Sequence, residues 1–105
     1  MFDYVKQAYG VPAEYGRRVT VGGRDGYIVE DMGSYIGITF DDDKVTMVRP
    51  HHPTGDGIVY GEMGTPRKMT RGQKQYREWQ RSDVDLSFFE YLKAKREAAK
   101  ESANV

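Results

Sequence analysis

The residue types able to do chemistry gather in two places: His51-His52 with the acidic run Asp41–Asp43, and a basic stretch over residues 67–81. Histidines and carboxylates are zinc ligands, but zinc needs three or four of them held tetrahedrally. Adjacent histidines on an extended segment point to opposite sides, so at most one could join the aspartates. We therefore expect a loop whose histidine rings cap the fold, and we predict neither a metal site nor a cofactor.

The remaining motifs favour a non-catalytic protein. The chain has no cysteine, which excludes thiol nucleophiles, thiolate zinc sites and disulfides. Asp41–Asp43 lacks the spaced ligands of a calcium loop and the apolar setting needed for acid–base work. No phosphate-binding loop, nucleophile elbow or dinucleotide-binding glycine motif is present. We expect Asp41–Asp43 to form a hairpin turn that keeps a sheet edge solvated.

The basic stretch is the main candidate site. The chain has 16 basic and 16 acidic side chains. The charge balance is −4 over residues 1–66, +5 over 67–81 and −1 over 82–105. Cations beside aromatic side chains suit phosphate contact combined with base stacking. The candidate nucleic-acid contacts are Arg67, Lys68, Arg71, Lys74, Arg77 and Arg81, and the candidate stacking residues are Tyr76, Trp79 and Tyr35.

Two other interpretations stay open. Tyr76 and Trp79 would pack a helix onto the rest of the fold, which would leave the cations as a solvated face or paired with carboxylates of residues 1–66. Overall neutrality also argues against strong non-specific duplex binding, which is typical of basic domains.

The second functional hypothesis is an inhibitor or adaptor that docks on a host protein. Its candidate residues are Tyr27, Tyr60, Phe88, Phe89 and Tyr91.

Turn signals at short intervals predict five strands. Period-two alternation between glycine-rich turns places these strands at residues 18–21, 27–30, 35–40, 45–49 and 58–60. In the third strand, Ile36, Ile38 and Phe40 share one face. Residues 50–57 are expected to be a loop. This spacing is typical of a small antiparallel barrel.

Helical periodicity appears on both sides of the strands. A short helix at residues 2–9, ended by Gly10, should lay one apolar face across an open end of the barrel; that face consists of Phe2, Val5 and Tyr9. Thr70 and Gln73 predict a capping box for a second helix. Residues 82–85 look like the cap of a third helix; its stripe comprises Val84, Phe88, Tyr91, Leu92 and Lys95.

We expect a single domain over residues 1–105. Its parts are a helix and lead-in at 1–15, a barrel at 16–64 and a helical extension at 65–105 that folds back on the barrel. No run of about 18 apolar residues is present, and the first residues lack the pattern of a signal peptide. We therefore predict a cytoplasmic protein that spans no membrane.

Residues 16–62 resemble SH3-like barrels of two families. Val19-Thr20-Val21, the Gly22-Gly23 turn, Gly26 and Ile28 resemble the start of KOW modules of ribosomal and transcription proteins. Residues 35–42 and 55–62 are similar to the two core motifs of CAP-Gly domains, although Thr54-Gly55-Asp56-Gly57 replaces their carboxylate-binding Lys-Asn-Asp-Gly. The resemblance implies a mainly β fold, a five-stranded antiparallel SH3-like barrel with appended helices.

The order of a short barrel, a basic helix and a second helix looks like small accessory proteins of tailed bacteriophages. That likeness implies a bacterial host cytoplasm. It also implies a task such as binding nucleic acid or disabling a host enzyme.

Overall fold

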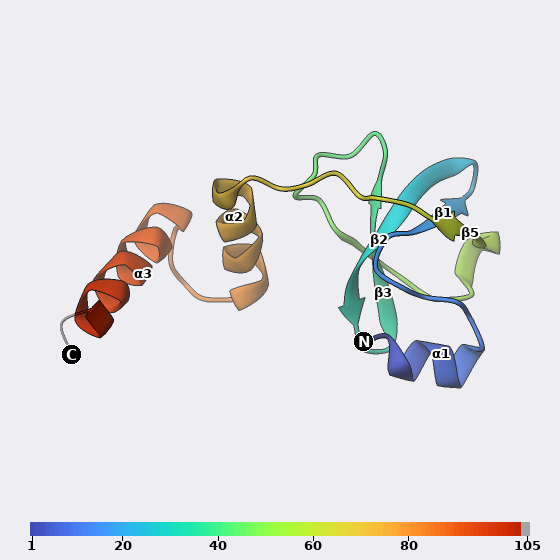
Figure 1. Cartoon of the computed structure of the whole chain (residues 1–105), viewed down its shortest axis with the longest axis horizontal. Coiled ribbons are helices and arrows are strands. Elements are labelled where there is room, and N and C mark those ends of the chain that lie inside the picture. The colour runs from blue at the N-terminus through green and yellow to red at the C-terminus, as the bar shows by residue number, and fades with distance from the viewer. Residues whose placement is uncertain (104–105) are drawn as a thin grey trace. The chain divides into compact units, whose positions relative to one another are not determined.

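The computed structural model describes residues 1–103, and the chain divides into two compact units (Figure 1). Met1–Lys68, here called the sheet unit, holds α1 and a five-stranded sheet. Met69–Val105, here called the helical unit, holds α2 and α3. Within the described part of the chain, no helix has the length and apolar character needed to cross a membrane.

The sheet is an antiparallel meander whose last strand returns beside the first. Its strands are β1 (Arg17–Val21), β2 (Arg24–Met32), β3 (Tyr35–Phe40), β4 (Arg49–His51) and β5 (Val59–Met63). They lie in the order β4-β3-β2-β1-β5, and Val19 pairs with Tyr60 where β1 meets β5. β4 and β5 are the two edges, so the sheet is open. The predicted five-stranded antiparallel sheet is confirmed, while its closure into a barrel stays a prediction.

The predicted fourth strand is wrong. Most of residues 45–49 lie outside any strand, and β4 covers only Arg49–His51, largely within the expected loop. The Asp43 carboxylate accounts for the shift, because it accepts hydrogen bonds from the backbone N–H of Phe40 and from the Arg49 guanidinium. Pro50 has no N–H to donate, and it is tolerated because β4 is an edge strand.

The core of the sheet unit is shared between the sheet and α1 (Asp3–Tyr9). Gly10 ends α1 in the left-handed conformation that glycine favours (φ 64°), and its N–H donates to the Lys6 carbonyl. The backbone N–H of Phe2 donates to the Asp31 carboxylate at 2.8 Å, which ties the start of α1 to β2. The predicted short helix is therefore confirmed. The core side chains are Phe2, Val5, Ala13, Val19, Ile28, Ile36, Ile38 and Phe40.

The first cap of the helical unit is the predicted one. α2 (Arg71–Ser82) begins at Thr70, whose hydroxyl accepts a hydrogen bond from the Gln73 N–H at 3.2 Å. The Gln73 side chain accepts one from the Thr70 N–H at 2.9 Å. These reciprocal bonds satisfy two backbone donors that the helix itself leaves unpaired.

The second predicted cap, at residues 82–85, is wrong. Asp83 adopts the left-handed conformation (φ 54°) and ends α2, and α3 (Phe88–Ala103) follows Ser87. The Ser87 hydroxyl accepts from the Glu90 N–H at 3.2 Å and so caps α3. Val84 therefore lies in the linker between α2 and α3 rather than in the helical stripe.

We predict that Asp43→Asn lowers the free energy of unfolding of the sheet unit by about 2 kcal/mol at neutral pH, because it removes hydrogen bonds to a charged acceptor. The Asp43 side chain is only 7% exposed, and the Arg49 guanidinium is the main cause that lowers its pKa. A carboxyl with a lowered folded-state pKa stabilises the fold above its unfolded pKa, about 3.9, and loses that contribution as pH falls through the folded value.

Urea unfolding at neutral pH and at about pH 3 measures both effects. Asp43→Asn should lose stability at neutral pH and depend less on acid than the wild type. Glu62→Gln is the matched control, because it removes the charge of an exposed carboxylate on β5. It should behave as wild type. An Asp43→Asn profile that matches the wild type would contradict this account of β4.

Candidate nucleic-acid interface

The acidic run of the sheet unit is paired with arginines of the same unit. Asp41 receives a two-point contact from the Arg18 guanidinium, with both distances 2.8 Å. That contact is the main cause that lowers the pKa of Asp41. The pairs are Arg18–Asp41, Arg24–Asp42 and Arg49–Asp43, at 2.8, 2.9 and 2.8 Å. These carboxylates are therefore already neutralised by local partners.

Arg67 and Lys68 belong to the sheet unit rather than to α2. The Arg67 guanidinium donates to the backbone carbonyls of Asp43 at 2.7 Å and Phe40 at 3.3 Å. Arg67 thereby holds the segment after β5 against the loop that follows β3. Its position is set by these contacts and not by the helical spacing of the other candidate cations.

Three of the four candidate cations of α2 share one side of the helix, because Arg77 and Arg81 follow Lys74 at i+3 and i+7. Arg71 and Lys74 are exposed, and the structure records no ion pair for either of them within the residues it describes. Arg77 and Arg81 each already have an interaction partner. The site described below therefore depends on Arg71 and Lys74.

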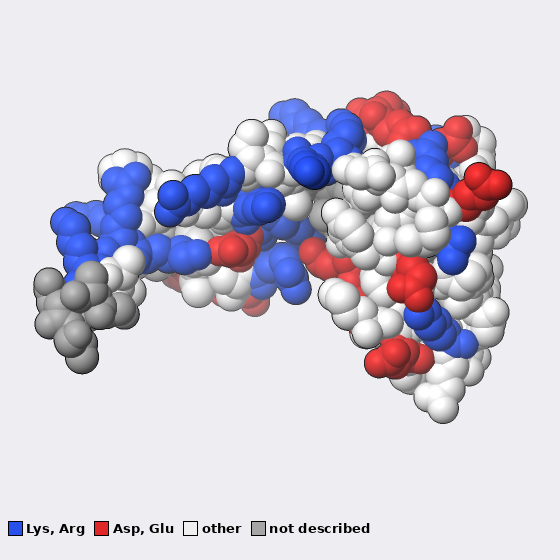
Figure 2. Space-filling view, in the orientation of Figure 1, with Lys and Arg blue, Asp and Glu red and all other residues white. Residues whose placement is uncertain are grey.

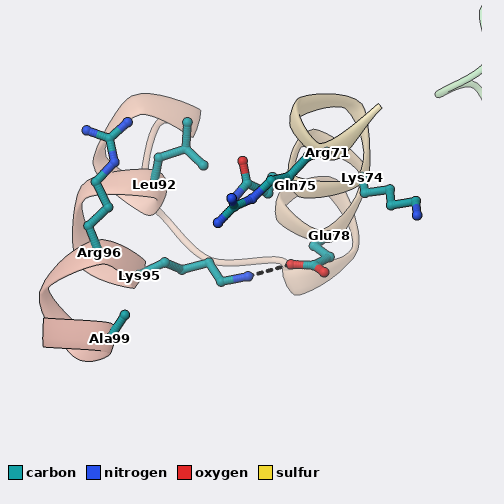
Figure 3. A pocket seen from close by; sticks show the side chains of 8 residues that line it. All are labelled: Arg71, Lys74, Gln75, Glu78, Leu92, Lys95, Arg96 and Ala99. Atoms are coloured by element: carbon teal, nitrogen blue, oxygen red, sulfur yellow. Dashed lines mark hydrogen bonds and ion pairs between the residues drawn. The ribbon is translucent and has the colours of Figure 1, made fainter. Parts of the chain in front are cut away.

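A groove of about 620 Å³ runs between α2 and α3 (Figure 3). Its lining residues recur at i, i+3, i+4 and i+7 on both helices, so each helix contributes one face. Figure 3 shows Arg71 pointing from α2 into the space between the helices and Lys95 reaching across from α3. The lining residues are Arg71, Lys74, Gln75, Glu78, Leu92, Lys95, Arg96 and Ala99.

Glu78 is the carboxylate among the residues that line this groove. Its Oε2 atom lies 2.6 Å from the Lys95 Nζ, and the Lys95 hydrogen bond is the main cause that lowers the pKa of Glu78. The same hydrogen bond to Glu78 is the main cause that raises the pKa of Lys95. The positive charge of Arg71 acts in the opposite direction and lowers the pKa of Lys95, because the two cations repel each other. Both partners of the ion pair are about half exposed, so the pair adds little stability and an incoming anion can exchange with it.

The aromatic side chains of α2 pack within the helical unit. Tyr76 and Trp79 lie 5.1 and 5.7 Å from the Phe88 ring, measured between ring centroids. The Trp79 indole N–H donates to the Leu86 carbonyl at 2.7 Å. Tyr76, Trp79 and Phe88 thus join α2 to α3, and we assign them to the packing of this hairpin.

The candidate tyrosines of the sheet unit are engaged by neighbours. The Arg18 guanidinium covers the Tyr27 ring at 4.3 Å, and the Tyr60 hydroxyl donates to the Pro53 carbonyl at 2.6 Å. Tyr35 remains exposed, although the edge of its ring contacts His52. On α3, Tyr91 is half-buried, whereas Phe89 is exposed.

The two histidines are placed by packing and by turn contacts. The His52 ring contacts Tyr9 of α1 at 5.0 Å and accepts a hydrogen bond from the Thr54 N–H. His51 Nε2 lies 3.3 Å from the Asp56 carboxylate. Within residues 1–103, no group of three or more His, Asp and Glu side chains is arranged to hold a metal ion.

No family model matches the chain, and neither a curated protein nor a solved structure matches it. The resemblances to KOW modules, CAP-Gly domains and phage accessory proteins therefore stay predictions. Lys95 and Arg96 were missed as site residues. The sequence shows their helical spacing with Leu92 and Ala99. It does not show that this face of α3 lies opposite α2.

We predict that Tyr60 ionises at a higher pH than a free tyrosine, whose pKa is about 10, because burial raises the pKa of Tyr60 to about 12. Absorbance at alkaline pH should show a late component in the wild type that Tyr60→Phe removes. Tyr35→Phe, which changes an exposed phenol, should keep the late component. Loss of the same component from both variants would contradict the described environment of Tyr60.

Proposed function

We propose that this protein is a non-catalytic binding module that contacts phosphate groups of nucleic acid through the groove between α2 and α3. The observation that carries the proposal is that four cations and a single carboxylate line one open groove. Arg71 and Lys95 point into the space between the helices, whereas the charged ends of Lys74 and Arg96 point outward from its rim (Figure 3). Two of these cations come from α2 and two from α3. They are Arg71, Lys74, Lys95 and Arg96.

The distribution of charge between the units supports this proposal. The sheet unit has eight basic and ten acidic side chains, whereas the helical unit has eight basic and six acidic ones. Figure 2 shows Lys and Arg side chains gathered along the helical unit, while both signs mix on the sheet unit. The zero net charge of the chain therefore conceals a basic surface of the kind that attracts polyanions.

The sheet unit serves as the folded body of this module, and we assign it to the SH3-like barrels. The return of β5 beside β1 supports the assignment. Register shifts between Arg17 and Val19 and between Ile28 and Glu30 also support it, because bulges bend strands. The cytoplasm of a phage-infected bacterium is the setting that we propose for this module.

Binding through phosphate contacts must weaken steeply as salt rises. Each phosphate contact contributes about −0.9 to the slope of log K against log salt for a duplex and about −0.7 for a single strand. Four contacts to a duplex would give a slope of about −3.6. The slope obtained from affinities at several salt concentrations therefore gives the number of phosphate contacts.

We predict that the double variant Arg71→Gln/Lys74→Gln lowers affinity for labelled oligonucleotides at least tenfold at low salt, because two phosphate contacts are lost. The slope should become shallower by about 1.4 for a single strand or about 1.8 for a duplex. Fluorescence anisotropy measured between about 50 and 200 mM salt gives both quantities.

Lys44→Gln is the matched control, because Lys44 is an exposed cation in the sheet unit. It should keep the wild-type affinity and slope. Circular dichroism of the double variant should show intact helices, since neither substituted side chain is buried. A wild-type protein that binds no oligonucleotide at low salt, or a double variant with an unchanged slope, would refute the proposed function.

A further inference from the structure

Phe89 is an exposed aromatic side chain at the start of α3. It is 77% exposed, whereas its neighbour Phe88 packs against Tyr76 and Trp79. Burying a phenylalanine side chain contributes roughly 1.5–3 kcal/mol, and most of that contribution is absent here. The ring of Phe89 therefore serves little in the packing of the hairpin and is available to a ligand.

Phe89 begins a row of exposed side chains along α3. The other members follow at i+4, i+7 and i+11, so the α-helical period places all four on one side. They are Lys93, Arg96 and Lys100. Arg96 also lines the groove, so the row and the groove share a cation.

The described acidic residues of α3 border this row on one side. Glu90 lies three positions before Lys93 and Glu97 lies four positions after it, so both carboxylates neighbour that lysine, while each is about 100° around the helix from Phe89 or Arg96. The Glu90 carboxylate also accepts a hydrogen bond from the Ser87 hydroxyl at 3.1 Å in the cap of α3. The side of α3 that carries Phe89 is therefore both cationic and aromatic.

We propose that the nucleic acid bound by this groove is single-stranded and that Phe89 stacks on one of its bases. This inference rests on the proposed function. Arg96 and the α2 cations would hold the flanking phosphates while the ring of Phe89 covers a base. Aromatic rings beside a cationic groove contribute to binding only when bases are unpaired, because a duplex encloses the faces of its bases.

The spacing along α3 suits this arrangement. Arg96 lies seven positions after Phe89, which corresponds to about 10 Å along the helix axis. That distance is about three steps of a stacked strand at 3.4 Å each. A base on Phe89 and a phosphate at Arg96 can therefore belong to one short stretch of the same strand.

The competing occupant of Phe89 is an apolar surface of a protein. The flanking cations favour the nucleic acid, because a docking site built on apolar contact is usually depleted of lysine. A protein partner is therefore an outcome that the experiment must separate.

The experiment uses the full chain and fluorescence anisotropy at low salt with three labelled probes of one mixed sequence. The probes are single-stranded DNA, the corresponding single-stranded RNA and the blunt DNA duplex. Phe89→Ala should weaken binding of the single strands about 5- to 100-fold and change duplex binding less than twofold. Phe89→Tyr, which retains an aromatic face, should bind like the wild type. Val84→Ala removes exposed apolar surface outside α3 and should have no effect.

The two proposals fail in different ways. If the wild type binds none of the probes, the proposed function is wrong. If the wild type binds with a steep salt dependence but Phe89→Ala leaves single-strand affinity unchanged, or weakens single strand and duplex equally, only the stacking role of Phe89 is wrong. A wild-type oligomer in sedimentation that Phe89→Ala converts to a monomer would likewise overturn this inference, because the ring would then be a protein contact.

Discussion

The pairing of arginines with the Asp41–Asp43 carboxylates is the interaction on which the rest of the structure depends. It neutralises the acidic run within the sheet unit, and the Asp43 contact with Arg49 places β4 in register. One set of contacts thus shapes the edge of the sheet and pairs the acidic run with arginines of its own unit.

The helical unit combines tight packing at one place with an open basic groove at another. Tyr76, Trp79 and Phe88 supply the aromatic contacts between the helices, and the Trp79 indole N–H holds the linker through the Leu86 carbonyl. Beside this cluster, long side chains line the groove and keep their charged heads in water. The hairpin is therefore held together by aromatic contacts, and Arg71 and Lys74 beside the groove have no ion pair within the described residues.

Features set by neighbouring residues were predictable from the sequence, whereas features set by distant contacts were not. The Thr70 cap and the Gly10 terminus need only adjacent residues. Ser82 and Ser87 both precede an acidic residue by three positions, and only the contact of Trp79 with the linker shows which of them caps α3. The α2 cations were visible as a basic stretch, but the contribution of α3 depends on how the two helices pair.

The most direct test of this account is an amide NMR titration of the full chain with a single-stranded oligonucleotide at low salt. We expect the largest shift changes in residues 71–78 and 89–99, with the core strands β1, β2 and β3 nearly unchanged. Raising the salt concentration should reverse these changes. Shift changes centred on the sheet unit, or none in the helical unit while the oligonucleotide is bound, would contradict the account.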